Sequence, residues 1–366
     1  MVARGDGLHC IAYLYDFTYF WASLMKTRTI RNLFAAAFVF VFFAYAPKDL
    51  PPKPASCPEH LLGFIGEYSH QGDTLYLLEN NQKLILQTKN QERFSLELQT
   101  KGTFLFSSGK FSNEPGGSFE QNKAGVTTGL KVGSRLFAKM FLGGEDGGTF
   151  RVTPLRPIAD LRREALIASP PVENGQFLKP MLVEVISLDS TIKLDIRYAS
   201  TNNFASTPFY SQARAFLQRP AAEGVVRAHR KLKSLGYGLL IHDAYRPWYV
   251  TKMFWDATPE DKRLFVADPS KGSRHNRGCA VDITLYDLAT GDVVEMPSGY
   301  DEFSERAYPH YPGGTSLQRW HRELLKWALE QEGFKVYEWE WWHFDFQDWQ
   351  KYPIGTLTFE QIESEK

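Results

Sequence analysis

The stretch SRHNRGCAVDITL, from Ser273 to Leu285, places two polar side chains of metal-binding type beside an apolar strand. His275 and Asp282 are separated by six residues, and Gly278 between them lets the backbone turn. Asp282 lies at the start of the run VDITL, whose apolar residues predict a buried strand. An unpaired carboxylate in apolar surroundings is costly, so we expect a cation or several hydrogen-bond donors next to Asp282.

A second polar cluster lies near the C-terminus, in EWEWWHFDF at residues 338–346. Glu340 and His343 are three residues apart and would face opposite sides of a regular strand, so both reach one site only at a bulge or a strand end. Two histidines and one aspartate around an open fourth position would form a catalytic zinc site, with a glutamate free to accept a proton from water. The alternative, from spacing alone, is that both histidines are ordinary core residues.

These two stretches together resemble the paired motifs S-x-H-x6-D and E-x-W-H of the VanX-type D-alanyl-D-alanine dipeptidases, a branch of the zinc D,D-peptidases. Two further stretches match in the expected order: LDIRYASTNNF at residues 194–204 and DAYRP at residues 243–247. The resemblance extends over residues 181–353 and leaves the first half of the chain outside it.

The resemblance implies a role for each residue that matches the motifs. His275, Asp282 and His343 would bind one zinc ion per chain. Glu340 would be general base and then general acid as a metal-bound water attacks the peptide carbonyl, and Arg246 would lie next to that carbonyl. The implied reaction is hydrolysis of the D-alanyl-D-alanine dipeptide to two molecules of D-alanine, so the chain is expected to be a zinc metallopeptidase.

A dipeptidase also has to hold a free ammonium and a free carboxylate, which favours a closed pocket with an acidic end. In EMPSGYDEF, at residues 295–303, Asp301 is the first candidate for the ammonium, ahead of Glu295 and Glu302. Ser273 is a candidate substrate contact through its backbone. The expected partner is therefore a small dipeptide or another substrate derived from peptidoglycan.

The composition is that of an ordinary globular protein. The chain has 366 residues, and its 43% hydrophobic content is enough for one full core or two. Lys and Arg together number 42, as do Asp and Glu, so the formal net charge is +0 and no basic field argues for nucleic acid as a partner. The 3 cysteines share no short spacing, which argues against a disulfide framework and against a cysteine-built zinc site.

Two folded domains are expected. Residues 59–158 contain short runs of period two, such as KLILQT and RFSLELQT, and predict a small all-β sandwich or barrel with an accessory role. Residues 159–180 predict a short helix and a linker. Residues 181–366 mix strand and helix patterns, which predicts an α+β domain with a central antiparallel sheet and flanking helices. On its predicted helices, His229 and His321 lie beside arginines and are expected to face solvent.

Residues 1–46 are expected to lie outside these domains. Three basic residues precede the apolar run LFAAAFVFVFFAYA at residues 33–46, which ends in a small-x-small triplet, as in a secretory signal peptide. A membrane anchor is the alternative, although the run is shorter than the about 20 residues that span a bilayer. We interpret residues 1–24 as the product of a start codon assigned too far upstream, and the proline-rich residues 47–58 as a linker. Export to the periplasm or surface of a bacterium follows, close to the membrane or the cell wall.

Two other functions compete with the dipeptidase hypothesis. One is a D,D-carboxypeptidase that trims peptidoglycan stem peptides, which an open groove in place of a closed pocket would favour. The other is a zinc-dependent module that binds the cell wall without turnover. Glu340 argues against this second alternative, because a purely structural metal site needs no unligated base.

Overall fold

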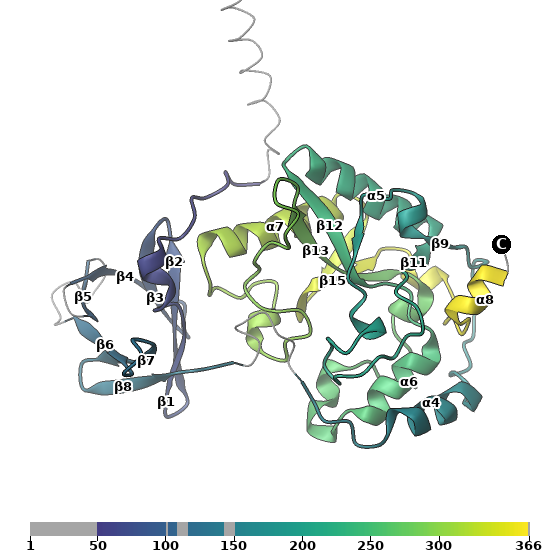
Figure 1. Ribbon diagram of the computed structural model, residues 1–366, viewed down its shortest axis with the longest axis horizontal. Helices are drawn as coiled ribbons and strands as arrows, with labels where there is room; N and C mark the ends of the chain where they lie inside the picture. Colours follow the sequence, from purple (N-terminus) through teal and green to yellow (C-terminus); the bar gives the residue numbers. More distant parts are fainter. Residues whose placement is uncertain (1–49, 100–101, 108–115, 143–150, 365–366) are drawn as a thin grey trace, which may run out of the picture. The chain divides into compact units, whose positions relative to one another are not determined.

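The computed structural model describes residues 50–99, 102–107, 116–142 and 151–364 (Figure 1). The chain divides into two compact units, Met1–Pro52 and Lys53–Lys366. The predicted signal peptide or anchor at residues 33–46 lies outside the described residues and stays a prediction. In the part of the chain that is described, none of the helices combines the length and the apolar character needed to cross a membrane.

The first half of Lys53–Lys366 contains a closed barrel of eight antiparallel strands, which a short helix, α3 (Glu59–Leu62), precedes. The sequence left a sandwich and a barrel as alternatives, and the pairing of β1 with both β2 and β8 makes it a barrel. The strands are β1 (Gly66–His70), β2 (Asp73–Asn80), β3 (Lys83–Thr88), β4 (Arg93–Leu98), β5 (Thr103–Phe106), β6 (Gly117–Gln121), β7 (Thr127–Val132) and β8 (Arg135–Lys139).

Apolar side chains from alternate strand positions fill the barrel. On β3, Leu84 and Leu86 are buried, whereas Lys83 at the start of the strand is exposed. Tyr68 on β1 is fully buried, and its hydroxyl donates a hydrogen bond of 2.5 Å to the Phe64 carbonyl. The period-two runs of the sequence therefore correspond to strands with one face in the barrel core.

The second half is a mixed α and β domain around a five-stranded sheet in the order β10-β12-β13-β15-β14. The same domain also contains a two-stranded antiparallel sheet of β9 and β11. The strands are β9 (Leu182–Glu184), β10 (Lys193–Leu194), β11 (Phe216–Gln218), β12 (Tyr237–Asp243), β13 (Ala280–Asp287), β14 (Phe334–Tyr337) and β15 (Glu340–Phe346).

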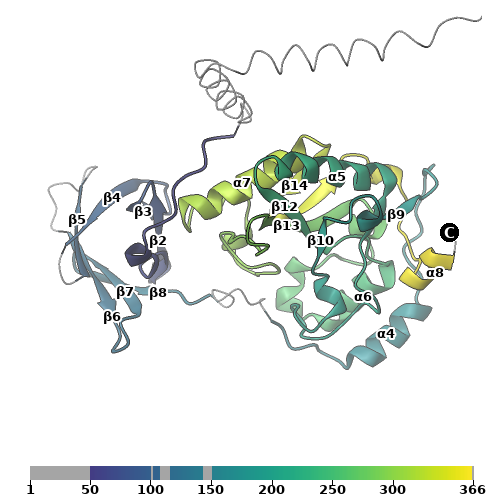
Figure 2. The same cartoon turned by 45° about the horizontal axis from the view of Figure 1, so that its top comes forward.

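Helices α5 and α7 pack against each other and against the sheet, whereas α4 and α6 pair with each other in another part of the domain (Figures 1 and 2). Thr315 caps α7 in a capping box with Gln318. The α-helices are α4 (Ile158–Ile167), α5 (Arg219–Lys233), α6 (Trp248–Ala257), α7 (Ser316–Glu330) and α8 (Phe359–Ser364). Short 3₁₀ helices are η2 (Val185–Ser187), η3 (Arg197–Ala199), η4 (Glu260–Phe265), η5 (His275–Arg277), η6 (Glu305–Ala307) and η7 (Trp349–Lys351).

The expectation of a central antiparallel sheet needs one correction. β12, β13, β15 and β14 pair antiparallel, but the two-residue strand β10 pairs parallel with β12. Between β10 and β12 the chain passes through β11 and α5, and a parallel pair requires a long crossover of this kind. The residues of β10 and β12 did not indicate the relative direction of the two strands, because that direction depends on the connection between them.

The expectation that His229 and His321 face solvent is wrong. Both side chains are buried, at 0% and 6% exposure. His229 on α5 accepts a hydrogen bond at Nδ1 from the Leu239 backbone N–H (3.0 Å), and its Nε2 lies 2.9 Å from the Thr191 hydroxyl. Burial lowers the pKa of each histidine to about 4. The prediction was based on the neighbouring arginines. It failed because adjacent residues of a helix point in different directions, so a histidine next to an exposed arginine can still face the protein interior.

Candidate metal centre and active site

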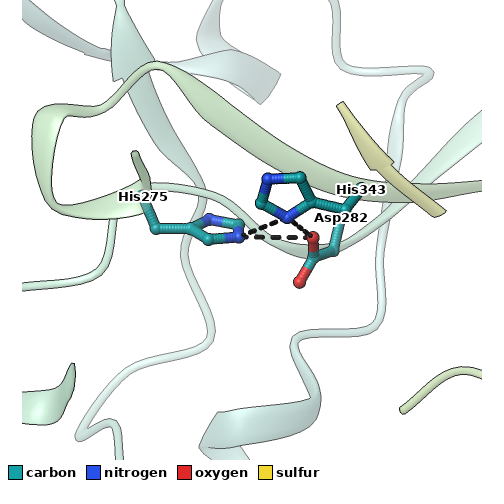
Figure 3. A group of neighbouring side chains, drawn as sticks. All are labelled: His275, Asp282 and His343. Atoms are coloured by element: carbon teal, nitrogen blue, oxygen red, sulfur yellow. Dashed lines mark hydrogen bonds and ion pairs between the residues drawn. The ribbon is translucent and has the colours of Figure 1, made fainter. Parts of the chain in front are cut away.

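His275, Asp282 and His343 are brought together as one buried cluster, as Figure 3 shows. Each contributes one atom that points toward the other two. His275 Nε2 lies 3.1 Å from His343 Nδ1 and 3.3 Å from Asp282 Oδ1, and His343 Nδ1 lies 2.9 Å from the same oxygen. The structure therefore gathers the three predicted ligands without any other residue between them.

The cluster fits a single zinc ion. Nitrogen and oxygen atoms that bind zinc tetrahedrally at about 2.0–2.1 Å lie about 3.3 Å from one another, close to the three observed separations. Two imidazoles and one carboxylate are also a donor set that zinc accepts in catalytic sites, where three protein ligands leave a fourth position open. Figure 3 shows all three side chains converging from separate segments of the ribbon.

Strand register places two of these residues opposite each other. Asp282 on β13 pairs directly with His343 on β15, so both side chains leave the sheet on the same face. His275 comes from η5, which ends at Gly278 with a left-handed φ of 65°. A Cβ at Gly278 would lie 2.6 Å from the Leu182 side chain, so the turn that sets His275 beside the strand requires glycine.

The outer nitrogen of each histidine has an acceptor of its own. His275 Nδ1 lies 2.7 Å from the Ala244 carbonyl oxygen, and His343 Nε2 lies 3.0 Å from Asp345 Oδ1. Asp345 is held in turn by Arg274 at 3.3 Å. With the outer nitrogens donating, His275 Nε2 and His343 Nδ1 are the nitrogens that face the centre of the cluster and would bind a metal ion.

Charges around the cluster favour a bound cation. Burial alone would lower the pKa of His343, but the carboxylates of Asp345 and Asp282 outweigh it and raise this pKa to about 10. Burial alone would raise the pKa of Asp282, but His275 and His343 hold it well below its usual range. The two carboxylates therefore stabilise positive charge at this position, whether it is a proton or a metal ion.

Glu340 lies at the first position of β15, 3.8 Å from His343 Nδ1 through its Oε2. The register of β14 with β15 shifts between Val336 and Tyr337, opposite Glu340. This irregular strand end explains how residues three apart reach one site. Burial raises the pKa of the Glu340 carboxyl to about 7, and Asp282 adds to the rise while His343 opposes it.

Arg246 lies in the same pocket and is 7% exposed. Its Nε and Nη2 donate to Asp243 Oδ2 at 3.0 Å and 2.7 Å, and the Tyr210 hydroxyl donates to the other Asp243 oxygen at 2.6 Å. The guanidinium lies over the rings of Tyr198 and Phe254, at 5.2 Å and 4.5 Å from their centroids. Arg246 is therefore rigidly oriented while lining the pocket.

A pocket of about 470 Å³ surrounds this cluster and is lined by every predicted site residue except Glu295, which lines a different pocket. Asp301 is 7% exposed, and the Tyr198 hydroxyl lies 3.0 Å from both of its oxygens. Burial, with the charges of Asp282 and Glu340, raises the pKa of Asp301 well above its usual range. Ser273 lines the pocket too, but its backbone N–H donates to the Asn276 side chain at 2.7 Å. That amide is therefore already satisfied.

Comparison with known proteins points to the same kind of site as the geometry of the cluster. A family model described as D-ala-D-ala dipeptidase (Peptidase_M15) matches residues 178–362. The D-alanyl-D-alanine dipeptidase of Escherichia coli (strain K12) is 32% identical over 173 residues, which are 47% of this chain and 88% of that protein. The chain belongs to the Peptidase_M15 family. It is accordingly a metallopeptidase, and the resemblance of its C-terminal half is confirmed.

Two further relatives of this metallopeptidase share the same description. The D-alanyl-D-alanine dipeptidase of Enterococcus faecium is 34% identical, and the matched region covers 46% of this chain and 92% of that protein. That of Enterococcus faecalis (strain ATCC 700802 / V583) is 32% identical and spans 51% and 98%. A solved structure of SurE with D-Leu matches 30% of this chain and 27% of its own at 21% identity, with a TM-score of 0.21, which is too low to inform the fold.

Sequence reasoning gave no role to several residues of the peptidase that support the site. The Tyr300 hydroxyl donates to Asp282 Oδ2 at 2.8 Å, and Tyr198, Asp243 and Asp345 fix Asp301, Arg246 and His343 respectively. All four residues fall in stretches quoted for other reasons. The contacts of Tyr198 and Tyr300 span 103 and 18 residues of chain, so spacing gave no signal for them, whereas Asp243 and Asp345 lie close in sequence to the residues they hold.

Proposed function

We propose that the peptidase binds one zinc ion and hydrolyses D-alanyl-D-alanine to two molecules of D-alanine. One observation carries this proposal: a carboxylate, Glu340, lies 3.8 Å from a ligand nitrogen of the His275, Asp282 and His343 cluster, in a pocket that also holds Arg246. A metal site with an adjacent base and a fixed cation suits hydrolysis of an amide better than a structural role.

Zinc at this cluster would acidify water and polarise the substrate carbonyl. Glu340 would accept the proton that water loses on attack and then pass it to the leaving amine. The pKa of Glu340, about 7, suits both steps, because a group that first accepts and then donates a proton works best near the ambient pH. Its position at an irregular strand end leaves one carboxylate oxygen facing the cluster.

Arg246 would donate to the oxyanion that develops on the substrate carbonyl. Asp243 occupies two of its nitrogens and holds the guanidinium in place, so little reorganisation is needed during the reaction. Asp301 would receive the substrate ammonium. Its buried carboxyl has a raised pKa, and an ammonium beside it would favour the ionised form. Ser273 would take part only through its carbonyl or hydroxyl, since Asn276 already accepts from its N–H.

The test is release of D-alanine from D-alanyl-D-alanine by the full chain, with zinc and after chelation. The Glu340→Gln variant should lose about two to four orders of magnitude in rate while retaining one zinc per chain. Glu338→Gln is the matched control, because Glu338 is an exposed glutamate two residues away. If zinc-loaded, folded protein releases no D-alanine but does release it from a peptidoglycan stem peptide, the substrate is the longer peptide and the carboxypeptidase alternative replaces the dipeptidase.

We also propose that the protein acts outside the cytoplasm, because the apolar run at residues 33–46 follows basic residues. Fractionation of the expressing bacterium, with N-terminal sequencing of the mature chain, tests this. Recovery of the uncleaved protein from the cytoplasm would contradict it.

A further inference from the structure

A second cavity, of about 740 Å³, lies next to the metal cluster. Its lining combines residues of the barrel, among them Glu67 and Lys139, with residues of the peptidase domain, among them Arg197 and His242. These two parts belong to one compact unit and share hydrogen bonds: Glu79 at the end of β2 accepts from the Ser316 backbone N–H at 2.7 Å. The cavity is thus built from both domains.

Two described side chains of opposite charge that line this cavity each carry a buried atom without a hydrogen-bond partner. Among the described residues, three buried side-chain polar atoms make no hydrogen bond, and two of them, Glu67 Oε1 and Arg197 Nη1, belong to residues that line this cavity. Glu67 is only 7% exposed although it occupies an outward-facing position of β1, next to the inward-facing Tyr68. Buried charged groups in folded proteins are nearly always satisfied, so this pair calls for a bound molecule.

Each of the two side chains has one partner within the protein. Arg197 donates from Nε to Asp195 at 2.6 Å, and the Tyr311 hydroxyl hydrogen-bonds the Glu67 carboxylate. Glu67 Oε1 remains as an acceptor on an anion, and Arg197 Nη1 remains as a donor on a cation. A ligand that satisfies both must carry a cationic donor and an anionic acceptor, as an α-amino acid or a peptide with free termini does.

We propose that this cavity binds a zwitterionic amino acid or short peptide, with its ammonium on Glu67 and its carboxylate on Arg197. The volume lies within the range of small-molecule sites, about 300–1,000 Å³, and is far larger than a few waters need. This site is separate from the catalytic pocket and does not depend on the proposed function. A free amino acid and a peptide share the recognised chemistry, and the experiment distinguishes them.

The position of the cavity gives this ligand a route to the metal cluster. Thr284 and Trp341 line the cavity, and each is two residues from a cluster residue on its own strand, so cavity and cluster lie along the same face of the sheet. Tyr300 lies between them. Its ring contacts His242 at 4.5 Å and the Arg197 guanidinium at 5.8 Å, while its hydroxyl holds Asp282.

The experiment is calorimetric titration of D-alanyl-D-alanine, and separately of D-alanine, into the full chain carrying Glu340→Gln, which prevents consumption of the peptide. We expect a binding event that Glu67→Gln weakens at least tenfold, because a hydrogen bond between charged groups is lost. The glutamine amide still accepts from Tyr311, so the fold is preserved, and an unchanged unfolding midpoint verifies this. Glu97→Gln, at an exposed glutamate of β4 outside the cavity, is the matched control and should bind as before.

A second variant and two modified probes complete the test. Arg197→Gln should weaken the same event, and N-acetyl-D-alanine and D-alanine methyl ester, which lack the ammonium and the carboxylate, should not compete for it. The stronger of the two unmodified probes identifies an amino acid or a peptide as the ligand. Binding that neither Glu67→Gln nor Arg197→Gln alters would overturn the proposal and leave the cavity filled by water. If the unaltered chain does not hydrolyse D-alanyl-D-alanine, that separate result bears only on the proposed function.

Discussion

The interior of the barrel and the pocket of the peptidase domain bury different kinds of side chain. The cluster that fills the barrel consists of apolar residues such as Leu77, Leu130 and Phe137, each fully buried. The peptidase domain instead buries charged residues such as Asp243, Arg246 and Asp282. Burial of a charge is costly unless it is paired, so such a set persists where chemistry requires it. The contrast teaches that the apolar interior of the barrel is explained by stability alone, whereas the buried charges of the peptidase domain are not.

The sharpest test of this contrast is Arg246→Lys. Lysine keeps the positive charge beside Asp243 but loses the planar fork, so we expect kcat for D-alanyl-D-alanine to fall by about two to three orders of magnitude with little change in zinc stoichiometry. Rate constants and metal content of the same preparation check this. A variant that retains at least a third of the activity would mean that the buried charge serves only the fold.

The converse test lies in the barrel. Leu130→Ala removes a fully buried side chain from its core and should lower the free energy of unfolding by about 2–5 kcal/mol. Urea unfolding measures this loss, and kcat below the transition should stay within about twofold of the unaltered chain. Leu136→Ala on β8, where the side chain is 42% exposed, is the control and should change stability by less than about 0.5 kcal/mol.

A smaller effect is expected at the carboxylate behind the metal cluster. Asp345→Asn keeps the shape of the contact to His343 Nε2 but removes its charge, and loss of such an outer partner typically lowers metal affinity by about 10- to 100-fold. Competition for zinc against a chelator measures this without reference to activity. Asp348→Asn, at a more exposed aspartate that pairs with Lys351, should leave the affinity unchanged.

The smallest effect concerns acid. The folded pKa of His229 is about 4 against 6.5 for the free side chain, so between these values the unfolded chain binds a proton that the folded chain does not. This contribution to stability is fully present above pH 6.5 and is lost as the pH falls toward 4. We compare the free energy of unfolding in urea at about pH 7.5 and about pH 5. On acidification, the His229→Asn variant should lose on the order of 1 kcal/mol less of this free energy than the unaltered chain. His310→Asn, at an exposed histidine, should behave like the unaltered chain.

Short-range pattern predicted much of the site and little of its surroundings. His275 and Asp282 were paired through Gly278, and the strand irregularity required by Glu340 and His343 is present. Each of these inferences depended on residues fewer than ten positions apart. The cavity between Glu67 and Arg197 depends on residues 130 positions apart in two domains, and the burial of His229 depends on which face of α5 meets its neighbours. No local pattern contains that information.

The direct pairing of Asp282 with His343 also limits how this sequence can vary. A single residue inserted into β13 or β15 would turn one of these side chains to the opposite face of the sheet and dismantle the cluster at once. The exposed turns among the 52 residues between the two strands, 288–339, carry no such constraint, since length added there leaves the register of β13 and β15 intact. Natural or engineered changes of substrate preference should therefore accumulate as insertions in those turns, while the two strands themselves admit only substitutions.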